Sequence, residues 1–161
     1  TLFNSRNVVA SIDYHSFGQL VLYPWGYTTA EIPNANEFLR PNTKTKDKVL
    51  FAELANKIAT EIGGYTPQKS SALYPVSGGS EDWEYNTKHS ASFVIEIGTV
   101  FQPPVAQIGI ISQANIKGAR WLMFWAVDQA LKKSLRLVHR EFGNEFSFAH
   151  ITLKAEHLAE R

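Results

Sequence analysis

The chain of 161 residues contains no cysteine, which excludes disulfide bonds but leaves the redox compartment open. It also lacks an excess of either charge, since the formal net charge is +1, and so offers no electrostatic reason to bind nucleic acid or an anionic membrane. No run of about 18 apolar residues, the length that spans a bilayer, is present. These absences predict a globular protein with neither a nucleic acid nor a membrane as partner.

The sequence has the composition of a folded domain. Its hydrophobic content of 44% suits a buried core, and a chain of this length buries about 70% of its unfolded surface. Hydrophobic periodicity separates helices from strands. It predicts helices at 46–62 and 112–142, and strands at 7–14, 19–23, 92–98 and 145–153. Polar connections are expected at 28–45 and 73–85, and a solvated helical end at 154–161. Strands alternating with helices indicate an α/β protein.

His15 is the first candidate for chemistry. The strand at 7–14 delivers its imidazole to the carboxyl end, and the chain then turns at Gly18. Open α/β sheets place their ligands at this end of the strands. A hydrogen-bonded structural histidine is the alternative interpretation.

Two later runs carry further candidates. The run at 73–85 begins with a tyrosine, Tyr74, continues through a glycine pair, and ends in the acids Glu81 and Asp82. The strand at 92–98 is apolar except for one carboxylate, Glu96. A carboxylate in an apolar strand must be paired or face a polar cleft, because burying it bare costs several kcal/mol.

In this order and spacing, together with the run at 19–27, these motifs resemble the C-terminal half of the zinc metallocarboxypeptidases of the carboxypeptidase A/B type. The resemblance covers about 7–116. It implies that His15 is the third zinc ligand, that Glu96 is the general base, and that Tyr74 closes over the terminal residue of the substrate. It also implies substrate binding by Ser16. Glu81 falls at the position in the specificity pocket that is apolar in the A type and acidic in the B type.

The resemblance carries expectations for the whole protein. It implies an α/β fold with a mixed, largely parallel sheet on which helices pack. It implies zinc-dependent proteolysis of C-terminal residues from peptides or proteins, basic residues among them, and favours a secreted or periplasmic location. The chain is expected to be one domain over 1–161, the C-terminal part of a catalytic domain, with an extended helix and tail at 117–161.

One part of the family pattern is not found upstream of His15. The family takes its first histidine and its glutamate ligand from a His-x-x-Glu segment, and only 14 residues precede His15 here. We therefore expect those ligands, and the arginines that bind substrate, to come from a complementing N-terminal half, or the chain to self-associate. The alternative function is a non-catalytic binding or interaction module. The run His157-Leu158-Ala159-Glu160 has the same spacing, and a permuted zinc site stands beside a plain helix end as its interpretation.

Overall fold

The computed structural model describes residues 5–33, 38–39 and 46–142, with side chains up to 135. The chain divides into two compact units, Thr1–Ala126 and Val127–Arg161, and each is considered by itself. All the described strands, and the candidate site residues, belong to the first unit. The second unit contains, among the described residues, only the end of the last helix. Three predicted features lie outside the described residues: the strand at 145–153, the helical end at 154–161 and the run from His157 to Glu160. The predicted domain limits stay a prediction.

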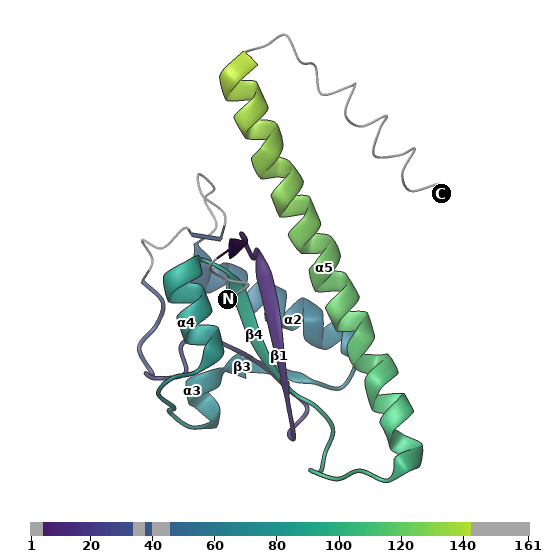
Figure 1. Ribbon diagram of the computed structural model, residues 1–161. Helices are drawn as coiled ribbons and strands as arrows, with labels where there is room; N and C mark the ends of the chain where they lie inside the picture. The colour runs from purple at the N-terminus through teal and green to yellow at the C-terminus, as the bar shows by residue number, and fades with distance from the viewer. Residues whose placement is uncertain (1–4, 34–37, 40–45, 143–161) are drawn as a thin grey trace, which may run out of the picture. The chain divides into compact units, whose positions relative to one another are not determined.

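The described residues form a mixed four-stranded sheet in the order β1-β4-β2-β3 (Figure 1). The strands are β1 (Ala10–His15), β2 (Leu20–Tyr23), β3 (Thr66–Lys69) and β4 (Ala91–Glu96). β1 is parallel to β4 and β2 is parallel to β3, whereas β2 and β4 are antiparallel. The prediction of a mixed, largely parallel sheet is confirmed. Every residue of β4 is buried, so this strand forms the centre of the fold.

Helix α2 (Asp47–Ile62) packs its apolar face on β2 and β3. It coincides with the helix predicted at 46–62, because its buried residues recur at helical spacing: Leu50, Phe51, Leu54, Ala55, Ile58, Ala59 and Ile62. The helix ends at Ile62, and Gly63, which follows it, has a φ of +87°, a positive value that favours glycine.

Two short helices flank Tyr74, and the second of them lies where a continuous loop was expected at 73–85. Helix α3 (Ser70–Leu73) precedes Tyr74, and helix α4 (Ser80–Lys88) begins after the glycine pair and packs on β4 and β1. The loop prediction was therefore wrong from Ser80 onward. A short, mostly polar helix has little apolar periodicity, so its stability comes from tertiary contacts that a sequence pattern does not display. Strand β3 was missed for a similar reason, since it is short and contains Pro67.

Helix α5 (Val105–Phe142) begins earlier than the predicted 112. Within the first unit, α5 packs on α2 at Gly118, where an added Cβ would lie 2.7 Å from Cγ1 of Ile62. Leu122, one turn further, is buried in the core. A side chain at 118 would thus hold α5 away from α2. Among the described residues, none of the helices combines the length and apolarity needed to cross a membrane.

Candidate active site

The two residues with the strongest chemical interpretation lie side by side at the carboxyl ends of two paired strands. His15 ends β1, Glu96 ends β4, and the two are register partners on these parallel strands. The pairing is maintained just beyond the strands, where the N–H of Ile97 donates to the carbonyl of His15 at 2.9 Å. Figure 1 shows β1 and β4 running side by side. The imidazole and the carboxylate, 81 positions apart in sequence, therefore leave the sheet from neighbouring backbone positions.

The turn after Glu96 is fixed by three hydrogen bonds. The carbonyl of Gly98 accepts from the N–H groups of Gly18 at 3.0 Å and Gln19 at 3.1 Å, in the turn that follows His15. The N–H of Gly98 donates to the hydroxyl of Tyr65 at 3.2 Å. The exits of both strands are thus tied together, which restrains the backbone beneath His15 and Glu96.

Glu96 is a buried carboxylate without a hydrogen-bond donor on one oxygen. The residue is 8% exposed, and its buried Oε2 accepts no hydrogen bond from any described residue. Burial raises the pKa of this carboxyl above its usual value, and the nearby His15 lowers it in part. A carboxyl with a raised pKa and an unused oxygen is suited to accept and return a proton.

The two buried aspartates have structural partners, which sets Glu96 apart from them. Asp47 accepts hydrogen bonds from the N–H groups of Phe38 and Leu39 and from the hydroxyl of Tyr85. Asp82 accepts from the N–H groups of Gly26 and Tyr27, at 2.9 to 3.0 Å. A buried acid with such donors is accounted for by folding.

His15 is half exposed, at 53% of its side chain, as a residue that reaches a ligand must be. Its Nε2 lies 3.3 Å from Oδ2 of Asp13, which is also half exposed. Asp13 was not singled out from the sequence. Its place two positions before His15 was the available signal, because alternate residues of a strand share a face.

Glu81 lies in the first turn of α4 and is only 4% exposed. Burial is the main cause that raises its pKa, the charges of Asp82 and Asp13 add to the rise, and the hydroxyl of Ser70 opposes it. The carboxylate is packed against glycines: an added Cβ on Gly26 would lie 3.0 Å from Oε1. Lys69, the nearby cation in sequence, instead donates to the backbone carbonyls at 29 and 30.

Two further candidates lie on the surface. Tyr74 follows α3 in an extended conformation and is 62% exposed, with Gly78 at a φ of +81° downstream. Ser16 is exposed next to His15, and the peptide bond from Ser16 to Phe17 is cis. Ser16 therefore lies beside His15 because it is the next residue in the chain. Among the described residues, Tyr74 makes no hydrogen bond or ion pair with His15, Glu81 or Glu96.

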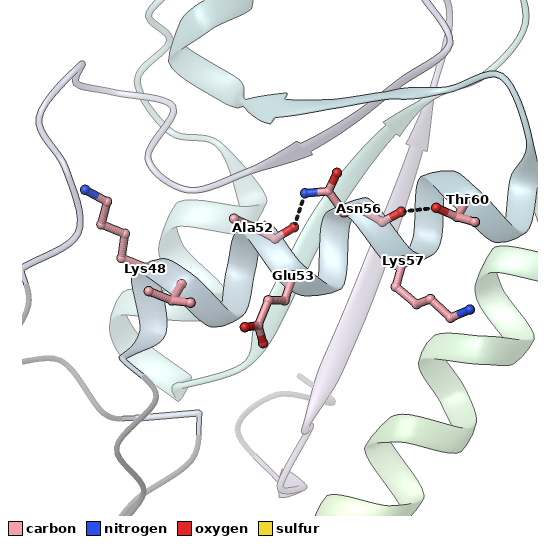
Figure 2. Close-up of a pocket in the computed structure, with 7 residues that line it drawn as sticks. Lys48, Ala52, Glu53, Asn56, Lys57 and Thr60 are labelled. Carbon is pink, nitrogen blue, oxygen red and sulfur yellow. Dashed lines mark hydrogen bonds between the residues drawn. The ribbon is translucent and has the colours of Figure 1, made fainter.

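A hollow of about 620 Å³ lies elsewhere, over the outer face of α2 (Figure 2). Two of the polar side chains along it bond within their own helix: the amide of Asn56 donates to the carbonyl of Ala52, and the hydroxyl of Thr60 donates to the carbonyl of Asn56. None of the candidate residues lines this hollow. The hollow is a solvated helix face, and none of the candidate catalytic residues lies in it.

Comparison with known families identifies the family of the chain. A family model described as zinc carboxypeptidase matches residues 1–118. The chain belongs to the zinc carboxypeptidase family. Carboxypeptidase A1 of Bos taurus is 32% identical over 121 residues, which cover 73% of this chain and 27% of that protein. Carboxypeptidase B of Bos taurus is 36% identical over 91 residues, covering 56% of this chain and 20% of that protein.

The fold is that of a carboxypeptidase as well. Bovine thrombin-activatable fibrinolysis inhibitor, solved in complex with tick carboxypeptidase inhibitor, superposes with a TM-score of 0.63 at 20% identity, covering 78% of this chain and 42% of that one. The predicted family membership is confirmed. The chain spans about a quarter of the length of the curated relatives it matches. The part of α5 beyond residue 118 lies outside the stretch matched by the family model.

Proposed function

We propose that this chain supplies the general base and one metal ligand of a zinc carboxypeptidase active site, which hydrolyses the last residue from peptides or proteins. The observation that carries this proposal is the pairing of Glu96 with His15 at the ends of parallel strands. The proposal is supported by Oε2 of Glu96, which is buried and accepts no hydrogen bond from a described residue. The buried aspartates Asp47 and Asp82, in contrast, accept hydrogen bonds from the backbone.

The chain supplies part of the ligand set of a zinc site. Zinc binds imidazole nitrogen readily, and His15 is the residue that would hold it. Catalytic zinc takes three protein ligands, and the described residues contain no group of three His, Asp or Glu able to hold a metal. The remaining ligands must come from outside the described residues. Bound zinc would lower the pKa of a water molecule and polarise the scissile carbonyl.

The chain's own residues would move the proton and enclose the substrate. Oε2 of Glu96 accepts a proton from the attacking water and returns it to the leaving amine. Tyr74, exposed and followed by a glycine-rich turn, covers the terminal residue of the substrate. Ser16, at the edge beside His15, contacts the substrate backbone.

We further propose that the terminal residue is basic. Glu81 is the acid available to recognise it, because Asp82 is bonded to backbone N–H groups and Lys69 to backbone carbonyls. A buried carboxylate that bonds a guanidinium or an ammonium group contributes about 1.5–3 kcal/mol. That is enough to prefer peptides ending in Arg or Lys to those ending in Leu or Phe.

Substitution of Glu96 by glutamine tests the base. In the complete enzyme that contains this chain, Glu96→Gln should abolish peptide turnover and leave zinc content unchanged, because the amide keeps the shape but cannot accept the proton. Glu53→Gln, on the exposed face of α2, is the matched control and should keep full turnover. Retained turnover in Glu96→Gln would make Glu96 a structural acid.

Because the ligand set is incomplete, we expect a further segment or a second copy of the chain to bind at the open edge of β1. Among the described strands, β1 is hydrogen-bonded only to β4, so its other edge is open to a complementing segment or to a second copy. Zinc content of the dialysed chain is the test. Little bound zinc and negligible hydrolysis by the chain alone, with both restored by an added N-terminal segment, would support complementation.

The alternative function, a non-catalytic binding module, is favoured by the same incomplete set of ligands. It predicts that no added segment restores zinc binding or hydrolysis. Stoichiometric, tightly held zinc in the chain alone would contradict both the complementation proposal and this alternative. A secreted or periplasmic location stays a prediction from family resemblance.

A further inference from the structure

One face of β1 is polar and lies against α4. Ser11, Asp13 and His15 share this face because they alternate along the strand. The hydroxyl of Ser11 donates to the carboxylate of Glu84, and the hydroxyl of Ser80 donates to Oδ2 of Asp13 at 3.0 Å. Helix α4 is thus joined to β1 by two side-chain hydrogen bonds.

The second of these contacts continues to the metal-ligand candidate. The same Oδ2 of Asp13 lies 3.3 Å from Nε2 of His15. One carboxylate oxygen therefore stands between the imidazole and the first residue of α4. Because both side chains are half exposed, the pair adds little stability, and its effect is on the orientation of the ring.

We propose that Asp13 is a positioning residue for His15. With Nε2 facing the carboxylate, the proton of the neutral ring resides on Nε2, and Nδ1 is the nitrogen left to bind a metal. Carboxylates that accept from the far nitrogen of a ligating histidine fix its tautomer and its orientation in this way. The metal part of this inference rests on the proposed function, whereas the contact between Asp13 and His15 does not.

Ser80 extends the arrangement to the residue proposed to recognise the substrate side chain. Its hydroxyl holds Asp13, and the next residue, Glu81, is the proposed recognition acid. The strand that presents the metal ligand and the helix that presents Glu81 are therefore joined through Asp13. Ser80→Ala should loosen Asp13 and produce a weaker form of the effect of Asp13→Ala.

The tautomer of His15 tests the proposal in the full chain without any metal. Long-range ¹H–¹⁵N NMR spectra, recorded where imidazole is neutral, should show Nε2 as the protonated nitrogen of His15. Asp13→Ala should raise the fraction protonated on Nδ1 severalfold, and Asp13→Asn should restore the original tautomer because its amide oxygen still accepts. Glu84→Ala is the matched control, since it removes the other contact between α4 and β1 and should leave the tautomer unchanged.

Zinc affinity separates this proposal from the proposed function. In the complete enzyme, titrated with zinc ion alone, Asp13→Ala should weaken binding by about 10- to 100-fold and Glu84→Ala should not. An unchanged tautomer in Asp13→Ala overturns the positioning role, even if zinc binds. A tautomer that responds in an enzyme that binds no zinc overturns the proposed function and supports the contact between Asp13 and His15.

Discussion

Glu96→Gln should stabilise the protein while removing its proposed activity. Because burial raises the pKa of Glu96 above 4.5, the folded protein binds the proton more tightly than the unfolded chain does. The free energy of unfolding therefore falls as the pH rises from 4.5 through the folded-state pKa, and the penalty is fully present above it. Replacing the charge by a neutral amide removes that penalty at neutral pH.

The size of the gain follows from the unpartnered oxygen. A buried polar group without a hydrogen bond costs about 1–3 kcal/mol. Since the glutamine amide is still polar at this 8% exposed position, we expect the lower end, about 1 kcal/mol. For a chain of 161 residues, this corresponds to an increase in Tm of about 3 °C.

Urea denaturation followed by tryptophan fluorescence measures this change in the free energy of unfolding. The difference between Glu96→Gln and the parent chain should appear at neutral pH and vanish below pH 4.5, where the parent carboxyl is itself protonated. Glu53→Gln should change stability little at either pH, because Glu53 is exposed on α2. A destabilised Glu96→Gln at neutral pH, or a gain that persists in acid, would refute the reasoning.

Five further predictions concern other parts of the fold and site. Asp82→Asn weakens the hydrogen bonds to two backbone N–H groups, and should lower the free energy of unfolding by about 1.5–3 kcal/mol in the same denaturation assay. Gly118→Val forces α5 away from Ile62, and should cost about 1–3 kcal/mol by thermal melting, whereas an unchanged Tm would place α5 elsewhere. In the complete enzyme, Glu81→Ile should reduce kcat/KM for peptides ending in Arg relative to Phe by roughly 10- to 150-fold, and equal loss for both would show that the acid does not recognise the side chain. Because burial raises the pKa of Glu81, the preference of the parent enzyme for Arg should decline as the pH falls, beginning at a higher pH than for an ordinary glutamate. The open edge of β1 predicts concentration-dependent association in sedimentation, and a monomer at all concentrations would count against it.

The sequence by itself determined the features that depend on local pattern. Helix α2 follows from apolar residues at helical spacing, and β4 follows from a continuous apolar run. Glu96 stood out because it interrupts that run, and His15 because it ends a strand before a turn. Each of these signals lies within a few residues of chain, which is the range over which periodicity acts.

Only the tertiary structure decided which of these residues meet and which acids are already engaged. The register that places His15 beside Glu96 depends on pairing between strands 81 positions apart, which local pattern does not encode. Asp82 and Glu81 are neighbours in sequence, yet one bonds backbone N–H groups and the other retains a raised pKa in a glycine-lined position. Helix α4 decides this difference, because its packing on β4 and β1 fixes where each side chain points. The chemical role of an acid in this protein is therefore determined by the donors that folding brings to it.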